Sequence, residues 1–166
     1  VDLSAGEADI DIRYGAFLPA PNVTVLPFPE ETIVVACSPA LANGPQPIRV
    51  LADLERHTLI YSEVNLVTWR DWLDANGLRH IDTIRGPRFD RTFMSVNAAA
   101  DGFGVALESR LVLQREIDAG RLTLPFGTLG PRLVCHHLLF LKSKANLPKV
   151  RAFREWLEDE LSRCEK

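Results

Sequence analysis

The chain has 166 residues, of which 46% are hydrophobic and 25% are charged, and this is the composition of an ordinary soluble globular protein. The length suits one domain or two small lobes with a real hydrophobic core. The balance of 19 Lys and Arg against 22 Asp and Glu gives a net charge of -3, which argues against a chain that binds nucleic acid through its own surface.

The apolar runs and the cysteines indicate in which cellular compartment the chain works. The longest apolar runs, around 33–36 and 138–141, have the length of a strand and are far too short to span a membrane. Residues 1–4 lack the basic and apolar segments of a signal peptide. The cysteines are widely spaced and form no C-x-x-C motif, which favours buried free thiols in a reducing, cytoplasmic setting over a disulfide or a metal site. They are Cys37, Cys135 and Cys164.

The first third of the chain predicts strands separated by irregular connections. Residues 1–7 resemble the end of a helix that stops at Gly6, and the alternation that follows is typical of a strand. Four prolines within 16–31 indicate a connection instead of a helix or strand. The strands are predicted at 9–15, 32–38 and 57–62, with a Pro/Gly-rich loop after the second and a short helix at 50–54.

A helix with an apolar stripe is predicted next. Trp69, Trp72 and Leu73 are spaced to share one helix face, and Asn76-Gly77 ends the helix. A short extended segment follows at 81–84. Three arginines then run from a strand end into a helix start, where they form either a carboxylate clamp or a solvated turn. They are Arg85, Arg88 and Arg91.

Residues 86–126 contain one unit that occurs twice, with a polar helix start, a helix, a glycine stop and a short extended segment. Asp90 or Thr92 is expected to cap the first helix, and Gly102 is expected to end it before a buried strand at 104–107. The spacing of four residues predicts a shared helix face, namely Phe93, Val96, Asn97 and Ala100. Ser109 caps the second helix, Gly120 stops it, and 122–124 is extended. This alternation indicates an α/β fold.

The C-terminal part predicts one long strand at 133–142 and one helix at 148–163. Together with 32–38, the long strand brackets a compact middle block, which suggests two lobes joined by two crossing strands. His136 and His137 are adjacent on a strand and therefore point to opposite faces, so they cannot easily share a metal ion. We expect no metal site and no cofactor.

No specific catalytic motif is present. The chain lacks G-x-S-x-G, G-x-x-x-x-G-K and H-E-x-x-H, and its Gly102-Phe103-Gly104 follows a helix instead of opening one. In α/β proteins, ligands bind where strands end near helix N-termini, because free N–H groups and the helix dipole favour anions. Such positions here are Ser62 and 90–92.

An ordered set of short motifs resembles one known family over nearly the whole chain. The motifs lie at 9–15 (DIDIRYG), 32–40 (TIVVACSPA), 51–54 (LADL), 69–73 (WRDWL), 86–89 (GPRF), 102–107 (GFGVAL) and 120–122 (GRL). Together they resemble the effector-binding domain of LysR-type transcriptional regulators, especially the branch that includes the glycine cleavage activator.

The resemblance implies a fold similar to type 2 periplasmic binding proteins, in which two α/β lobes hold a small-molecule effector in the cleft between them. It places 1–31 and 137–166 in the first lobe and 32–136 in the second. It also implies a cytoplasmic regulator that forms dimers or tetramers and contacts promoter DNA only through a separate domain absent from this chain. Such domains usually begin with further strands before the position of Val1, so we expect an incomplete first lobe.

The family's effector-binding positions map onto five residues, and Arg91 is added for its charge. The predicted effector-binding residues are Tyr14, Ser62, Phe89, Arg91, Thr92 and Val105. The expected effector is a small polar or anionic metabolite, such as an amino acid or a carboxylate. Two alternatives remain open: a solute-binding protein of a transporter, and an enzyme on the same architecture, for which His136, His137 or Glu108 would supply the acid and base.

Overall fold

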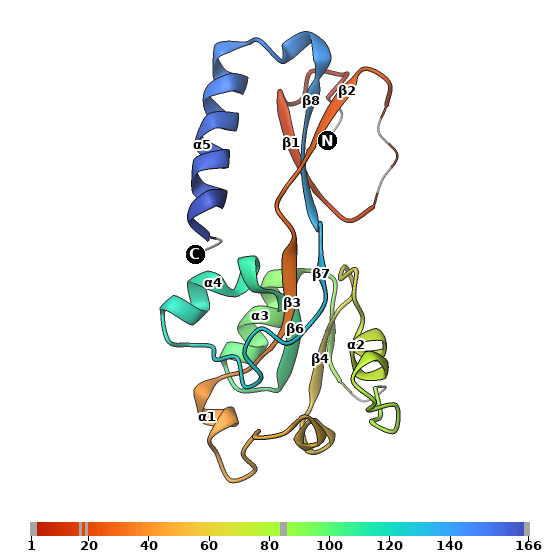
Figure 1. Cartoon of the computed structure of the whole chain (residues 1–166), viewed down its shortest axis with the longest axis vertical. Coiled ribbons are helices and arrows are strands. Elements are labelled where there is room, and N and C mark those ends of the chain that lie inside the picture. Colours follow the sequence, from red (N-terminus) through yellow and green to blue (C-terminus); the bar gives the residue numbers. More distant parts are fainter. Residues whose placement is uncertain (1–2, 17, 19, 84–85, 165–166) are drawn as a thin grey trace. The chain divides into compact units, whose positions relative to one another are not determined.

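The computed structural model describes residues 3–16, 18, 20–83 and 86–164, and the chain forms two compact units (Figure 1). Unit 1 contains residues 1–30 and 133–166, and unit 2 contains residues 31–132. The chain therefore passes twice between the units, once on either side of the middle segment.

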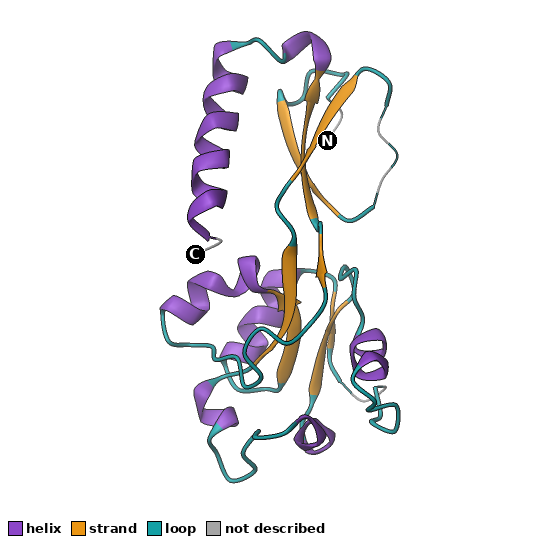
Figure 2. Ribbon diagram, viewed as in Figure 1, coloured by secondary structure: helices purple, strands orange, loops and turns teal. Residues whose placement is uncertain are grey.

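Unit 1 is a three-stranded antiparallel sheet with one long helix (Figure 2). The strand order is β1-β8-β2, so the last strand of the chain lies in the middle. In chain order the elements are β1 (Ile10–Tyr14), β2 (Val23–Pro27), β8 (His136–Leu141), the 3-10 helix η2 (Lys142–Lys144) and α5 (Pro148–Cys164).

The apolar run of β8 supplies the core of unit 1. Leu138, Leu139 and Phe140 are all buried between the two outer strands, which is why this segment carries no charge. Val150 of α5 is also fully buried, and the guanidinium of Arg154 lies 5.2 Å from the centre of the Phe140 ring. The helix thus packs against the sheet through its apolar side and the flat face of an arginine.

Unit 2 is a five-stranded mixed sheet in the order β5-β4-β6-β3-β7. The strands are β3 (Glu31–Ala36), β4 (Leu59–Ser62), β5 (Arg88–Phe89), β6 (Val105–Ser109) and β7 (Arg132–Leu133). β4 runs parallel to both β5 and β6, while β3 and β6 are antiparallel. The carboxyl ends of β4, β5 and β6 therefore meet at one edge of the sheet.

Helices join the strands of unit 2. They are α1 (Pro39–Ala42), the 3-10 helix η1 (Leu51–Arg56), α2 (Trp69–Ala75), α3 (Thr92–Ala100) and α4 (Arg110–Asp118). α3 packs on the sheet through small side chains: Ala98 and Ala99 are buried in one apolar cluster with Ile60 and Ala106. Small residues let the helix approach the strands closely, and this brings its N-terminal turn to the edge where the parallel strands end.

Several expectations about the elements need correction. Residues 3–6 form turns instead of a helix end, and the connection predicted at 16–31 contains β2. β2 is an edge strand, where prolines such as Pro27 are tolerated because one side of the strand needs no hydrogen-bond donor. The long strand predicted at 133–142 is two strands, β7 and β8, in different sheets.

The first helix of the repeated unit also differs from its prediction. Its N-cap is Arg91, and no side chain caps it, so neither Asp90 nor Thr92 has the capping role. The predicted apolar face is wrong for two of its four residues: Phe93 is 63% exposed and Asn97 is exposed, while Val96 is buried and Ala100 packs against the apolar cluster. The buried side consists of Ser95, Val96, Ala98 and Ala99. Of the segment predicted at 81–84, residues 81–83 form no strand and residue 84 lies outside the described residues.

Candidate functional site

The carboxyl ends of β4 and β5 bring two of the predicted residues together. Ser62 is directly opposite Phe89 in the parallel register. Backbone hydrogen bonds on either side fix this pairing, from the Tyr61 N–H to the Pro87 carbonyl (2.9 Å) and from the Glu63 N–H to the Phe89 carbonyl (2.8 Å). The partly buried Phe89 ring packs against the apolar cluster under α3.

A buried carboxyl group lies on the same face of the sheet. Ile60 pairs with Ala106, and Ser62 and Glu108 each follow two residues later, so both point toward α3. The Glu108 side chain is only 2% exposed and makes a short hydrogen bond with the hydroxyl of Ser95. Burial raises the pKa of Glu108 to about 7, and the nearby polar groups of Ser95, Asn65 and Ser62 limit the rise.

Ser62 differs from the other polar groups of this cluster. The Asn65 amide donates to the Leu107 carbonyl oxygen (2.6 Å), and the Ser95 hydroxyl also contacts the Thr92 carbonyl oxygen (2.7 Å). The Ser62 hydroxyl is close enough to lower the pKa of Glu108, but it is buried without good hydrogen-bond geometry to any group in the described part of the chain. Such a hydroxyl is costly unless something else binds it.

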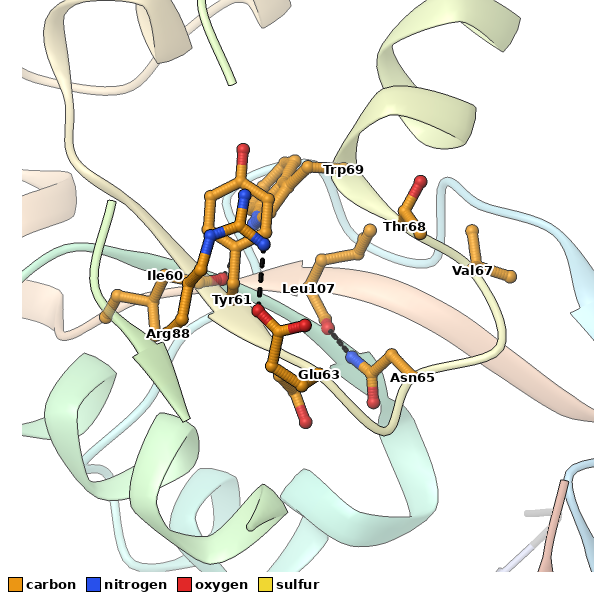
Figure 3. A pocket seen from close by; sticks show the side chains of 10 residues that line it. Ile60, Tyr61, Glu63, Asn65, Val67, Thr68, Trp69, Arg88 and Leu107 are labelled. Carbon is orange, nitrogen blue, oxygen red and sulfur yellow. Dashed lines mark hydrogen bonds and ion pairs between the residues drawn. The ribbon is translucent and has the colours of Figure 1, made fainter. Parts of the chain in front are cut away.

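Figure 3 shows a small pocket of about 70 Å³ at this end of the sheet. Its lining comes from β4, the loop into α2, β5 and β6. The lining residues are Ile60, Tyr61, Ser62, Glu63, Asn65, Val67, Thr68, Trp69, Arg88 and Leu107.

Hydrogen bonds and one ring contact hold the walls of the pocket. The Trp69 indole N–H donates to the Ile60 carbonyl (2.8 Å), which fixes the ring at the start of α2. The Arg88 guanidinium lies over the Tyr61 ring, 4.3 Å from its centre, and pairs with the Glu63 carboxylate at 2.8 Å (Figure 3). Tyr61 precedes Ser62 on β4, so the aromatic wall lies on the opposite face of the strand from the Ser62 side chain, and Ser62 lines the pocket at the edge of the strand.

The remaining predicted residues are distributed unevenly around this pocket. Arg91 and Thr92 lie at the start of α3, close to Ser62 along the sheet edge, and exposed Arg91 pairs with Asp90 at 3.4 Å. Val105 is fully buried and pairs with Leu59, at the opposite end of the parallel strands from Ser62. The structure does not bring Val105 to the pocket.

Tyr14 belongs to unit 1. It ends β1 opposite His136, and the two rings meet edge to face with 5.0 Å between their centres. The proposed carboxylate clamp also has little support from the side chains, since Arg88 pairs with Glu63, Arg91 pairs with Asp90, and Arg85 lies outside the described residues.

Sequence reasoning missed the polar cluster under α3. The sequence motifs point to Glu108 only as a candidate acid or base, and they give no role to Ser95 or Asn65. The available signal was the strand period, which puts Glu108 on the same face as Ala106 and therefore under a helix. Within the described ranges, no three His, Cys, Asp or Glu side chains gather to hold a metal ion, and no helix is long and apolar enough to cross a membrane.

Comparison with known families decides the classification. The model of the LysR substrate binding domain matches residues 1–162. The chain belongs to this LysR family. Its α/β architecture, similar to type 2 periplasmic binding proteins, is confirmed as that of a LysR substrate-binding domain.

Curated relatives of this LysR domain are transcription regulators. The chain is 36% identical over 156 residues to the HTH-type transcriptional regulator PerR of Escherichia coli, and the match covers 93% of this chain and 51% of PerR. It is 35% identical over 156 residues to the glycine cleavage system transcriptional activator of the same organism, covering 94% of this chain and 50% of that protein. The chain thus spans about half the length of these relatives.

Solved structures agree with this LysR assignment. The AmpR effector-binding domain of Citrobacter freundii is 26% identical with a TM-score of 0.79, covering 98% of this chain and 79% of that chain. The AmpR effector domain of Pseudomonas aeruginosa is 29% identical with a TM-score of 0.73, covering 98% of this chain and 76% of that chain.

Proposed function

We propose that this LysR domain senses a small metabolite for a bacterial transcription regulator, and that Ser62 contacts the metabolite. The observation that carries the proposal is the buried Ser62 hydroxyl, which lacks a good hydrogen-bond partner in the described part of the chain and borders a pocket. A ligand that accepts or donates one hydrogen bond there would remove the cost of burying this hydroxyl.

The effector is a small polar or anionic molecule, such as an amino acid or a carboxylate. The start of α3 follows β5 and therefore lies at the same sheet edge as Ser62. No side chain caps this start, so the N–H groups of the first turn and the positive end of the helix dipole are not satisfied by a side-chain cap. The Arg91 guanidinium at this helix start pairs with the Asp90 carboxylate, so the helix start itself provides the partial positive charges. These groups favour negative charge on the ligand.

The domain acts by a shift in population. An effector with different affinities for two conformations of the domain favours one of them, and the rest of the regulator transmits that change to promoter DNA. We propose a cytoplasmic dimer or tetramer in which DNA is bound by a part of the protein outside this chain. The relatives, which are HTH-type and other transcription regulators, support this role.

We propose no catalytic role for the domain. Glu108 is one candidate, but its carboxyl group is buried under α3 and contacts the Ser95 hydroxyl, so a substrate cannot reach it without displacing the helix. The other candidates, His136 and His137, begin β8 in unit 1 on opposite faces of the strand.

A thermal-shift screen tests the proposal. Amino acids and small carboxylates are added to the domain, and the melting midpoint is measured for each. A ligand at a hundredfold excess over its Kd stabilises the folded state by about 2.7 kcal/mol, which raises the midpoint by roughly 5–10 °C for a domain of this size. The Ser62→Ala variant should melt at the wild-type temperature or slightly higher without ligand, because Ser62 has no good partner to lose.

The same variant should lose most of the shift that the ligand causes. Ser143→Ala, which removes an exposed hydroxyl from η2, is the control and should keep the full shift. A ligand that stabilises Ser62→Ala as much as the wild type would overturn the assignment of Ser62. If no amino acid or carboxylate raises the midpoint, the proposed class of effector is wrong.

A further inference from the structure

The contacts of Ser95 require one more proton than its hydroxyl carries. Ser95 Oγ lies 2.7 Å from the Thr92 carbonyl oxygen and also makes a short contact with Glu108 Oε1. A serine hydroxyl has a single proton, and a carbonyl oxygen can only accept. If Ser95 donates to Thr92, the short contact with Glu108 needs a proton on the carboxyl group, because two acceptor oxygens without a proton repel each other.

In the part of the chain that the structure describes, no cation shifts the pKa of Glu108, so none stabilises its carboxylate form. Its neighbour on β3 is Val34, and the face that it shares carries the apolar cluster of Ile60, Ala106 and Leu113. The charged residues on and next to the elements around it are Glu31, Glu63, Arg88, Asp90, Arg91, Arg110, Arg115, Glu116 and Asp118. Glu63 pairs with Arg88, and Asp90 pairs with Arg91, and none of these charged residues is among the groups that shift the pKa of Glu108.

The other buried glutamate of unit 2 is a useful contrast. Glu31 is 6% exposed and also makes a short hydrogen bond with a serine hydroxyl, that of Ser109. Ser109 is the neighbour of Glu108 on β6, so it points to the opposite face of the sheet. The two glutamates therefore match in burial and in partner type but occupy different environments.

We propose that Glu108 is a buried proton-binding site, held as a neutral carboxylic acid that donates its proton to Ser95 and so ties α3 to β6. When Glu108 releases this proton to solvent, the Ser95 hydroxyl can donate either to the Thr92 carbonyl oxygen or to the new carboxylate, but not to both. One of the two hydrogen bonds of the Ser95 hydroxyl is then lost, and a charge remains in an apolar cluster. The site lies beneath the residues proposed to contact the effector, but it does not depend on that function.

The direction of the pH effect follows from the pKa. In the folded chain the pKa of Glu108 is about 7, above the ordinary value of 4.5 for the unfolded chain. The stabilisation due to the bound proton is therefore complete below pH 4.5 and is lost as the pH rises through 7. Across this range the equilibrium constant for unfolding should increase roughly a hundredfold because of Glu108 alone.

The test follows the glutamate carboxyl carbons of the whole domain, labelled with ¹³C, by NMR from pH 4 to pH 9. One carboxyl should titrate near neutral pH in the wild type. That titration should be absent in Glu108→Gln and retained in Glu31→Gln. Urea unfolding at pH 5 and pH 8.5 should show a large loss of stability for the wild type and for Glu31→Gln, and a much smaller loss for Glu108→Gln.

A second measurement needs no variant. The infrared spectrum of the wild-type domain at pH 6 should contain the stretch of a protonated carboxylic acid, and this band should disappear by pH 9. If the band is missing at pH 6, if every glutamate titrates in the ordinary acidic range, or if Glu108→Gln keeps the neutral titration, the proposal is overturned. None of these outcomes depends on whether an effector binds at Ser62.

Discussion

At Gly86 the chain passes so close to β4 that a side chain has no room. A Cβ atom there would lie 1.6 Å from the Leu59 carbonyl oxygen, which is a backbone atom and cannot move aside easily. This close approach lets Pro87 accept a hydrogen bond from Tyr61 and sets the register that puts Phe89 beside Ser62. One missing side chain thus helps to build the candidate site.

Replacing Gly86 by alanine should therefore destabilise the domain strongly. We expect Gly86→Ala to lower the free energy of unfolding by about 2–4 kcal/mol, because the segment before β5 must move away from β4. Gly77→Ala is the matched control: Gly77 has a φ of +75° but no atom within 4 Å of the added Cβ, so only backbone strain of about 1 kcal/mol is expected. Urea unfolding at one pH measures both, and equal losses would contradict the role of close approach.

At the scale of the element, the start of α2 is held by a reciprocal cap. The Thr68 hydroxyl accepts from the Asp71 N–H (3.2 Å), and the Asp71 carboxylate accepts from the Thr68 N–H (2.9 Å). The Thr68 hydroxyl and backbone N–H hold the pKa of Asp71 below its ordinary value of 3.8. The contribution of this carboxylate to stability is therefore present at neutral pH and is lost as the pH falls through the lowered pKa.

Removing the cap should loosen the helix that borders the pocket. Thr68→Ala should lower the free energy of unfolding by about 1 kcal/mol, the usual cost of losing an N-cap hydroxyl. Thr68→Ser keeps the hydroxyl and should stay within about 0.5 kcal/mol of the wild type. The comparison is made by urea unfolding at neutral pH. A serine variant as unstable as the alanine variant would show that the methyl group of Thr68, and not its hydroxyl, matters.

The long elements could be predicted from the sequence because their signals are local. The apolar stripe and Asn76-Gly77 predict α2, and Ser109 and Gly120 bound α4, with the Ser109 hydroxyl accepting from the Leu111 N–H as expected. β2 and β5 could not be predicted, because a proline-rich segment and a two-residue strand are defined by the strands beside them. Local pattern fails where the partner of a strand decides its structure.

The site could be predicted only in part for the same reason. Ser62 and the start of α3 follow from the rule that strand ends and helix starts meet in α/β folds. The buried face of α3 does not follow from its most hydrophobic residue, because exposed Phe93 lies outside it while small Ala99 and polar Ser95 lie inside. α3 packs so closely on the sheet that only small side chains fit between them. The hydrophobicity pattern of the sequence does not show this need for small size.

At the scale of the whole molecule, the two units are assembled from the chain in different ways. Unit 2 is one continuous segment with its own five-stranded sheet and apolar cluster. Unit 1 is assembled from both ends of the chain, since β1 and β2 each pair with β8, more than a hundred residues later. Folding of unit 1 therefore has to wait until distant segments meet, while unit 2 needs only its own residues.

This difference predicts how fragments of the chain behave. Residues 31–133, which retain β7, should fold alone and unfold cooperatively in urea, because every strand of that sheet is present. Residues 1–30 should stay unfolded, since β1 and β2 lack β8, and a two-stranded remnant is at best marginally stable. Circular dichroism and the dispersion of amide NMR signals distinguish the two outcomes.

The control joins 1–30 to 133–166 through a flexible Gly/Ser linker, which restores β8 and should increase ordered strand content over that of 1–30 alone. If 31–133 shows no cooperative transition, the core of unit 2 depends on residues of unit 1, and the division into independently folding units fails.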